Sequence, residues 1–299
     1  MNFPLLQAKK QGEARYHLGL LLTTTIWAST FINIKIVLLQ VPPNTLAFLR
    51  FVIASLALGF YIKYKGYPLI PRKDWPRVAL CGLTGIALYN FLQNQGLRYA
   101  GSTDAAILAS MAPVFMALLA WAYLKEKISS RQVAGIIMAF TGSALVATKG
   151  SLESLTLNPT QLFGDSLILI TGISWAIYST SVKKLLDRYP VTSVLAYCTF
   201  AGTIFLAPLV LLEYPVNLAA VDLWDWLNIV YLGLMASALA YLLWNAGLAK
   251  VPAVTAGAYL YLLPVIAAVI AAIFLQETPG FFTIAGGLLA LVGTYFASK

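Results

Sequence analysis

The sequence predicts an all-α integral membrane protein with ten transmembrane helices in two inverted five-helix repeats around a central cavity. Three observations support this fold class. Hydrophobic residues make up 60% of the chain and charged residues only 10%, whereas roughly a quarter of the residues are charged in a soluble domain. Apolar runs long enough to cross a membrane recur along the whole chain. The second half of the sequence also repeats the pattern of the first.

The repetition is clearest in residues 82–142, which align without a gap with residues 233–293 when the sequence is shifted by 151 positions. Glycine, proline and glutamate recur in register, which a shared apolar composition alone does not explain. The aligned pairs include Gly82 with Gly233, Ala105 with Ala256, Pro113 with Pro264, Glu126 with Glu277, and Gly142 with Gly293. We interpret this register as an internal duplication.

A second shift, of 148 positions, extends the duplication towards the start of each half, where Trp27 aligns with Trp175. A repeat of this length indicates duplicated half-domains rather than a solenoid of short units. We therefore divide the chain into a first repeat, residues 1–150, and a second repeat, residues 151–299.

Each predicted helix corresponds to one apolar run. A run of about 20 residues crosses a hydrocarbon core of about 30 Å. The runs must be helical, because an isolated strand would leave its backbone groups unpaired in lipid. The first run begins at His17, and nine more follow near residues 44–64, 76–98, 103–123, 130–149, 161–186, 191–213, 225–248, 253–275 and 279–298.

The charges between the runs predict the orientation. Ten crossings place both termini on one side, and cytoplasmic loops are rich in Lys and Arg. With both termini in the cytoplasm, all the Lys and Arg residues lie in cytoplasmic segments except Lys35, Arg50, Arg98 and Lys149. We therefore expect a multi-pass protein of the plasma (cell inner) membrane. An odd number of helices per repeat then inverts the second repeat relative to the first, as in many secondary transporters.

Composition also argues against several other classes of protein. The net charge of +9 lies in short loops without the basic-aromatic modules of nucleic-acid binding. Cys81 and Cys198 are isolated in apolar runs, so neither a disulfide framework nor a metal site is expected. The chain lacks a G-x-x-x-x-G-K-[ST] phosphate loop, which argues against ATP-driven pumping. With His17 as the single histidine, no catalytic cluster is visible, and we expect neither an enzyme nor a bound cofactor.

Polar and aromatic residues at corresponding positions of the two repeats predict the lining of the cavity. Asn90, Gln93 and Asn94 share one face of a helix, and the aligned positions of the second repeat are also polar or aromatic. Such side chains face protein or water at membrane depth; the alternative is that they bond neighbouring helices. The candidate substrate-binding residues are Trp27, Thr30, Asn90, Gln93, Asn94, Ser110, Trp175, Tyr178, Tyr241, Trp244, Asn245, Tyr259 and Tyr261.

Two prolines and one arginine stand out inside the runs. Pro113 and Pro264 each remove an intrahelical hydrogen bond, which indicates either hinges beside the cavity or static kinks. Arg50 lies about two turns inside its helix by the α-helical repeat, where a charge needs a partner or a wet cavity. Glu126 and Glu277 follow corresponding helices and are interpreted as loop-anchoring residues.

Glycines spaced seven residues apart lie on one face of the fifth and of the tenth predicted helix. They are Gly135 with Gly142, and Gly286 with Gly293. Small residues allow helices to approach closely. We expect these faces to pack against other helices, with a dimer interface as the alternative.

Proton coupling is not expected from the distribution of carboxylates. No Asp or Glu lies near the middle of a run, so a buried carboxylate that carries a proton is not visible. We expect transport to follow the solute gradient. Glu126, Asp104 and Lys35 are the first candidates if a proton gradient were required.

Several short motifs carry a family resemblance. They are Trp27-Ala28-Ser29-Thr30-Phe31, Leu49-Arg50-Phe51, Asn94-x-Gly96-Leu97, Met111-Ala112-Pro113-Val114 and Leu124-Lys125-Glu126. In order and duplication, the chain resembles the EamA-type transporters of the drug/metabolite transporter (DMT) superfamily over nearly its whole length. The resemblance implies ten helices in two inverted repeats, with the fifth and tenth helices at the periphery. It also implies transport of amino acids or other small metabolites, often outward. The intramembrane glutamate of the four-helix multidrug relatives is missing, which argues against cation-drug antiport.

We therefore predict a secondary or facilitative transporter, an exporter of small metabolites such as amino acids that works by alternating access. The expected partners are a small-molecule substrate and the lipid bilayer, with a monomer or homodimer as the functional unit. The alternatives are transport of drugs or nucleotide-type metabolites, or an integral-membrane enzyme.

Overall fold

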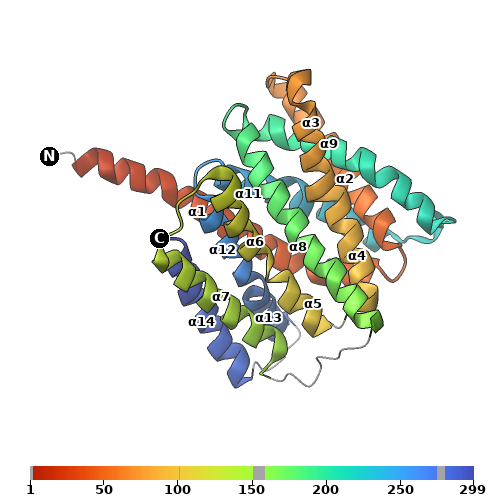
Figure 1. Cartoon of the computed structure of the whole chain (residues 1–299). Helices are drawn as coiled ribbons and strands as arrows, with labels where there is room; N and C mark the ends of the chain where they lie inside the picture. The colour runs from red at the N-terminus through yellow and green to blue at the C-terminus, as the bar shows by residue number, and fades with distance from the viewer. Residues whose placement is uncertain (1–2, 101, 151–158, 275–279) are drawn as a thin grey trace.

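The structure is a computed structural model that describes residues 3–100, 102–150, 159–274 and 280–299. Within these ranges it is all-helical and contains no strand (Figure 1). The first half contains α1 (Phe3–Val37), α2 (Pro43–Lys65), α3 (Trp75–Gly82), α4 (Tyr89–Tyr99), α5 (Ser102–Ala109), α6 (Ala112–Leu119) and α7 (Ser130–Thr148). The second half contains α8 (Pro159–Leu186), α9 (Val191–Val210), α10 (Leu223–Tyr231), α11 (Ala240–Leu248), α12 (Ala253–Ala258), α13 (Leu263–Phe274) and α14 (Phe281–Ala297).

Non-α turns join some of these helices into longer stretches. A π-helical segment, Leu83–Leu88, connects α3 to α4, and another, Leu232–Leu239, connects α10 to α11. A third π-helical segment, Ala120–Leu124, follows α6, and a 3-10 turn, Tyr259–Leu262, joins α12 to α13. The first two occupy corresponding positions of the duplication. π-Helical turns are rare and occur often at functional sites.

Seven helices in the described part of the chain are long and apolar enough to cross a membrane. They are Pro43–Lys65, Ile107–Leu124, Ser130–Thr148, Pro159–Leu186, Val191–Glu213, Leu223–Leu248 and Ala253–Ile270. Three predicted runs are not among them. Those that begin at His17 and near 76–98 are helical, and Phe281–Ala297 in the last run is apolar but shorter. The all-helical fold is confirmed, whereas ten crossings and the inverted repeat stay predictions.

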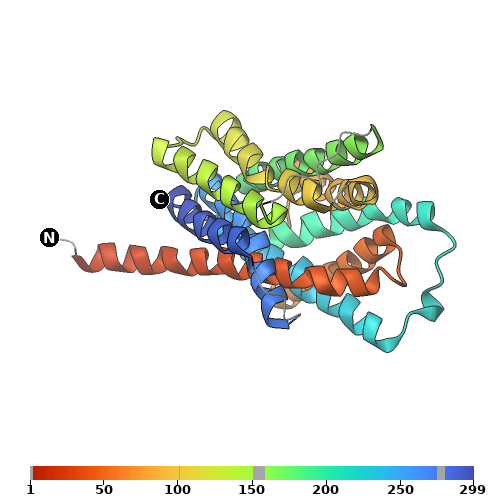
Figure 2. The ribbon, with the colours of Figure 1, turned by 90° about the horizontal axis from the view of Figure 1, so that it is seen from below.

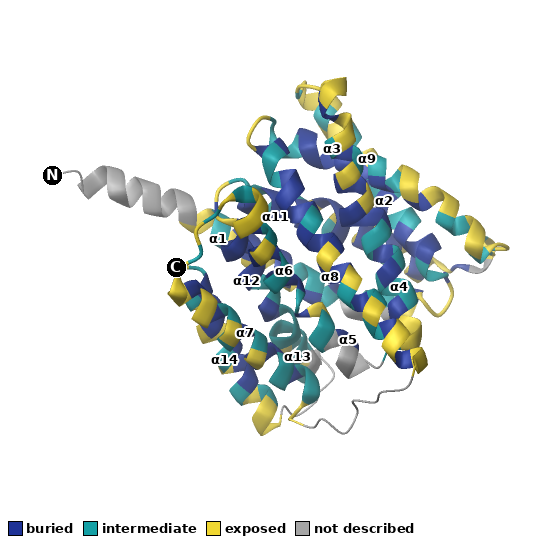
Figure 3. Cartoon of the chain, viewed as in Figure 1, coloured by how far each residue is buried: buried dark blue, intermediate teal, exposed yellow. Residues whose placement is uncertain are grey.

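The helices pack with their buried residues towards each other and large apolar side chains outwards. Buried residues gather in the middle of the bundle, around α8 and α11 (Figure 3). Trp244, Tyr178 and Tyr261 are the largest of the fully buried side chains. Phe60 and Leu288 are 74% and 60% exposed, which suits a surface that faces lipid tails.

Residues that correspond in the duplication contact each other at two places. The rings of Trp27 and Trp175 lie edge to face with their centroids 5.3 Å apart. The hydroxyl groups of Ser55 on α2 and Thr203 on α9, which are 148 positions apart, lie 2.9 Å from each other. Such contacts between equivalent residues are expected on a two-fold axis that relates similar halves.

The peripheral helices α7 and α14 lie side by side in both views of the ribbon (Figures 1 and 2). Gly135 packs against the backbone of Gly293, and Gly142 packs against the backbone of Gly286. The order of the contacts shows that the two helices run antiparallel. The glycine faces therefore pack against each other within the chain.

A polar cluster joins the start of α3 to the end of α8. Asp74 accepts hydrogen bonds of 2.6 Å from the Tyr189 hydroxyl and from the Arg188 guanidinium. The bond from Tyr189 is the main cause that holds the pKa of Asp74 below its ordinary value, with Arg188 adding to it. The two bonds fix the loop before α3 to the segment that follows α8.

We expect the Asp74 cluster to stabilise the fold at neutral pH and to lose its effect in acid. A carboxyl group whose pKa is lowered by folding stabilises the native state above its unfolded pKa, about 3.9. That contribution is lost as the pH falls through the folded pKa. Thermal unfolding in detergent should show Asp74→Asn to be less stable than wild type at pH 7, with a smaller further loss below about pH 4. Identical acid profiles of the two proteins would contradict this role.

The contact between α7 and α14 predicts that Gly142 does not tolerate a side chain. A Cβ at Gly142 would lie 2.9 Å from the Cα of Ala290. Because the neighbouring atoms on α14 are backbone atoms, the side chain fits only if the two helices move apart. We expect Gly142→Val to lower the free energy of unfolding by about 1–3 kcal/mol. Gly59→Val is the matched control, because a Cβ at Gly59 meets no atom within 4 Å. Equal thermal midpoints of the two variants would refute this packing.

Candidate functional site

A central cavity of about 350 Å³ lies between the two halves of the chain. Residues of α1, α2, α4, α5 and α6 line it from the first half, and residues of α8, α11 and α13 line it from the second. Its volume falls at the lower end of the range of small-molecule sites, about 300–1,000 Å³. The cavity therefore has room for a small solute and draws its walls from both predicted repeats.

The structure brings several of the predicted site residues together around this cavity. Their side chains come from helices that are far apart in the sequence. The predicted residues that line the cavity are Trp27, Thr30, Asn90, Gln93, Ser110, Trp175 and Tyr241, together with the predicted hinge Pro264. Substrate binding by these residues stays a prediction, since the cavity shows only where they lie.

The remaining predicted residues do not line the cavity. They are Asn94, Tyr178, Trp244, Asn245, Tyr259 and Tyr261, together with the predicted hinge Pro113. Tyr178 and Asn245 are fully buried and hydrogen-bond to each other at 2.9 and 3.1 Å. The Tyr259 hydroxyl lies 2.8 Å from Nδ1 of His17. These contacts join helices to each other, which is the structural role that polar residues also take in membranes.

The two prolines occupy corresponding positions at breaks in their helices. Pro113 is at the first turn of α6, directly after a turn at Ser110 and Met111. Pro264 is at the first turn of α13, directly after the 3-10 turn. Proline is tolerated at the start of a helix, where its missing N–H group has no partner to lose. The helices are therefore interrupted before the prolines, beside the cavity.

Aromatic rings form one wall of the cavity. Trp27 contacts Tyr241 with 5.6 Å between ring centroids, and Trp175 contacts Tyr241 at 5.7 Å and Tyr89 at 5.3 Å. Trp244 packs behind this wall, 5.6 Å from Trp27. The two contacts of Tyr241 are edge to face, an arrangement that is favourable beyond the area it buries. The wall is therefore a connected cluster rather than a set of separate side chains.

Hydrogen bonds fix this wall to the two π-helical segments. The Trp27 indole N–H donates to the Ala236 carbonyl at 3.1 Å, and the Tyr241 hydroxyl donates to the Gly85 carbonyl at 3.0 Å. Both bonds cross from one half of the chain to the other. Gly85 and Ala236 correspond in the duplication, so the same backbone position accepts from an aromatic residue in each half. The indole N–H of Trp175, by contrast, has no hydrogen-bond partner within the described part of the chain.

Among the described residues, Arg50 is the one arginine or lysine that lines the cavity. Its Nε donates to the Ser237 hydroxyl at 2.8 Å, and its guanidinium lies 5.1 Å from the centre of the Phe51 ring. The ion pairs in the described part of the chain are Lys183–Glu126 and Arg188–Asp74, so no described carboxylate neutralises Arg50. Its depth in the helix predicted a partner or a wet cavity, but sequence reasoning did not place it among the binding residues.

A second polar cluster fixes the segment after α6 to the start of α12. The Glu126 carboxylate accepts from the Ala253 backbone N–H at 2.9 Å and from Lys183 Nζ at 2.8 Å. Lys183 also donates to the Val251 carbonyl at 2.8 Å. A carboxylate at the first turn of a helix satisfies free N–H groups and suits the helix dipole. Glu126 thus anchors a loop as the sequence predicted, whereas Glu277 and the side chains of Asp104 and Lys35 lie outside the described residues.

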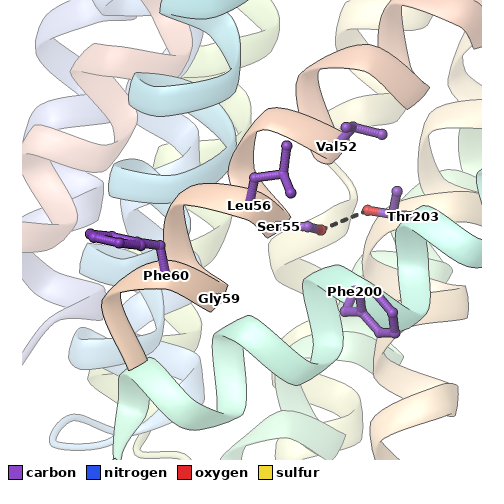
Figure 4. Close-up of a pocket in the computed structure, with 7 residues that line it drawn as sticks. All are labelled: Val52, Ser55, Leu56, Gly59, Phe60, Phe200 and Thr203. Carbon is purple, nitrogen blue, oxygen red and sulfur yellow. Dashed lines mark hydrogen bonds between the residues drawn. The ribbon is translucent and has the colours of Figure 1, made fainter. Parts of the chain in front are cut away.

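An outer hollow of about 500 Å³ lies between α2 and α9 (Figure 4). Ser55 and Thr203, which line it, point towards each other in Figure 4 and are joined by their hydrogen bond. Leu56 and Phe200 beside them are 69% and 61% exposed. This hollow has few polar groups that could orient a solute, so the central cavity is the better candidate site. No group of three or more potential metal ligands occurs among the described residues.

Cysteine labelling tests which predicted residues reach the cavity. Gln93 lines it, whereas Asn245 is fully buried away from it. In a variant with Cys81 and Cys198 replaced by Ala, we expect Gln93→Cys to react with a small methanethiosulfonate reagent at least about tenfold faster than Asn245→Cys, because only the exposed thiol becomes a reactive thiolate. Mass spectrometry of the labelled protein follows the rates. Faster labelling at position 245 would place the cavity elsewhere.

Comparison with known proteins agrees with a membrane transporter. The sequence profile described as the EamA-like transporter family matches residues 14–148 and again residues 162–299. An "Uncharacterized transporter" of Archaeoglobus fulgidus is 34% identical, over 95% of this chain and 98% of that protein. A protein of Streptantibioticus cattleyicolor named "Probable terminal-alkyne amino-acid exporter" is 32% identical, over 94% and 92% of the two chains.

Two proteins of lower sequence identity are also similar to this chain. A protein of Salmonella typhimurium named "Probable amino-acid metabolite efflux pump" is 27% identical, over 92% of each chain. A protein known from its crystal structure superposes with a TM-score of 0.81 at 20% identity, over 96% of each chain, which shows that the two share a fold. The resemblance found in the sequence motifs is thereby confirmed, and the protein with this central cavity, a multi-pass membrane protein, belongs to the EamA-like transporter family.

Proposed function

We propose that the protein is a secondary or facilitative transporter that exports small metabolites such as amino acids across the plasma membrane by alternating access. The observation that carries this proposal is the central cavity of about 350 Å³, whose walls come from both halves of the chain. Two matches to the EamA-like transporter family support it. Family and relatives agree with transport rather than catalysis.

The proposed architecture is ten transmembrane helices in two inverted repeats, residues 1–150 and 151–299, with both termini in the cytoplasm. Contacts between equivalent residues support it, since Ser55 bonds to Thr203 and Trp27 contacts Trp175. The antiparallel packing of α7 and α14 also agrees with it. Two halves of opposite orientation can exchange conformations, which opens one central site to each side in turn.

The Glu126 cluster closes one end of the molecule in this arrangement. Lys183, Glu126 and the start of α12 lie at the predicted cytoplasmic end and are joined by hydrogen bonds of 2.8–2.9 Å. We propose that these bonds hold the cytoplasmic side closed. Opening towards the cytoplasm would then require α12 to separate from Glu126.

Amino acids are the proposed solutes because of the size of the cavity and the names of two relatives. The relatives of 32% and 27% identity are named as amino-acid or amino-acid metabolite exporters. We further propose that transport follows the solute gradient. No Asp or Glu lines the cavity in the described part of the chain, so no carboxylate there can bind a driving proton.

Flux measurements in proteoliposomes test the proposed function. With amino acids on one side and no pH difference, at clamped membrane voltage, we expect downhill flux that unlabelled amino acid on the opposite side accelerates. Ala109→Trp, which fills the cavity, should reduce this flux about tenfold or more, because a solute that cannot be positioned is not transported. Ala134→Trp on the exposed face of α7 is the matched control and should transport like wild type.

Two results would overturn parts of this proposal. Uphill accumulation that appears only with an imposed pH difference would show proton coupling. Flux of drug cations or nucleotide-type metabolites without flux of any amino acid would replace the proposed solute class.

A further inference from the structure

We propose that the Arg50 guanidinium binds a carboxylate in the central cavity, so that the solute is a small monocarboxylate with an apolar body, either an amino acid zwitterion or a simple carboxylic acid. This inference rests on the proposed function, because it names the chemical class that the cavity takes. It makes Arg50 the residue that orients the solute.

The first step is the set of free donors on Arg50. A guanidinium carries five N–H donors in a planar fork and accepts nothing. Only one of them is used in the structure, where Nε donates to the Ser237 hydroxyl at 2.8 Å. The two terminal amino groups have no hydrogen-bond partner among the described residues, and Arg50 is one of the residues that line the cavity. Two parallel N–H groups of this kind match the two oxygens of a carboxylate.

The second step is charge. A guanidinium at membrane depth needs a counter-charge or water, and the described cavity wall contains no carboxylate. It contains no second arginine or lysine either. One positive charge balances one carboxylate, whereas a phosphate group carries about −1.5 to −2 at neutral pH and would leave negative charge unpaired. A lone cation would be repelled. The charge of the cavity therefore favours a single carboxylate.

The third step is the rest of the wall. Besides Arg50, the wall contains the rings of Trp27, Tyr89, Trp175 and Tyr241. It also contains the aliphatic side chains of Leu97, Ile168 and Leu260. These surfaces suit an apolar body. An ammonium group, where the solute has one, would find aromatic faces that attract cations and the amides of Asn90 and Gln93. A carboxylate with an apolar or aromatic side chain satisfies all of these groups together.

The Arg50 fork is also held between the two halves of the chain. Arg50 belongs to α2, and Ser237 belongs to the π-helical segment Leu232–Leu239 of the second half. The Ser237 hydroxyl fixes Nε and thereby the plane of the guanidinium. Ser237 is thus a positioning residue, and a change in the packing of α2 on this segment would turn the fork away from the solute.

Tryptophan fluorescence measures binding without transport, because Trp27 and Trp175 line the cavity. The purified full chain in nanodiscs is titrated with alanine, leucine and phenylalanine, with their amides, with 3-phenylpropanoate and with phenethylamine. We expect at least one carboxylate to bind about tenfold to a hundredfold more tightly than its amide, as a hydrogen bond to a charged group would give. Phenethylamine should bind no better than the amides.

The variants assign this preference to Arg50. Arg50→Gln should remove the difference between carboxylate and amide, and Arg50→Lys should retain part of it because a lysine keeps the charge without the fork. Ser237→Ala should weaken carboxylate binding by several-fold and leave amide binding unchanged. Arg98→Gln is the matched control, because Arg98 is exposed on α4 and does not line the cavity. If Arg50→Gln does not fold, as judged by size-exclusion chromatography, the effect of Ser237→Ala and the comparison of carboxylates with amides test the inference instead.

Two outcomes would overturn the inference. One is that no carboxylate in the series binds more tightly than its amide, and the other is that the preference survives in Arg50→Gln. Failure of the proposed function gives a different result, namely Arg50-dependent binding of a carboxylate without any flux in proteoliposomes. Flux of uncharged or cationic solutes that does not depend on Arg50 would preserve transport and reject the carboxylate site.

Discussion

The contact between Trp27 and Trp175 is the interaction on which the centre of the molecule depends. The two rings lie 5.3 Å apart and occupy equivalent positions in the two halves, so each half supplies the same residue to the same place. Around them, side chains of one half donate to backbone carbonyls of the other, as Tyr241 does to Gly85. In lipid, every polar backbone group must find its partner within the protein. The carbonyl groups of the π-helical segments accept these bonds, so the cavity wall depends on contacts between the two halves.

The two halves of the chain contribute different side chains to the cavity at corresponding positions. Asn90 and Gln93 of the first half correspond to Tyr241 and Trp244 of the second. Arg50 corresponds to Cys198, which is fully buried. The amides and the guanidinium that line the cavity thus come from the first half, whereas the corresponding positions of the second half carry two large rings and a cysteine. The two similar halves provide the same set of helices, and the substitutions between them make the cavity lining asymmetric.

This asymmetry explains how far the sequence could predict the site. The duplication placed polar residues on the correct helices, since Asn90, Gln93 and Tyr241 do line the cavity. It could not separate Asn245 from them, because periodicity shows the face of a helix and not which side chains larger neighbours cover. Asn245 is fully buried and bonds to the Tyr178 hydroxyl. The depth of Arg50 was visible in the sequence, but its partner Ser237 is 187 positions away and follows only from packing.

The fold as a whole was easier to predict, because lipid leaves few choices. A chain with long apolar runs must be helical in a membrane, and the structure is all-helical throughout the described residues. The interruptions were harder. Pro113 and Pro264 marked two of them, but nothing in the local sequence signals the π-helical turn at Leu83–Leu88. Tertiary contacts explain it, since Tyr241 and Ser174 donate to its carbonyl oxygens.

The contacts also bear on which parts would move in the proposed transport cycle. Backbone meets backbone along the glycine faces of α7 and α14, so these helices cannot slide without steric overlap. The proposed cytoplasmic closure instead depends on Glu126 and Lys183, whose side chains are 15% and 18% exposed, together with a few hydrogen bonds. Alternating access requires states that differ by only a few kcal/mol. A closure made of a partly hydrated ion pair would satisfy this requirement, because water can replace each bond as it breaks. The glycine interface has no such substitute, so in the proposed cycle it would stay closed in both states.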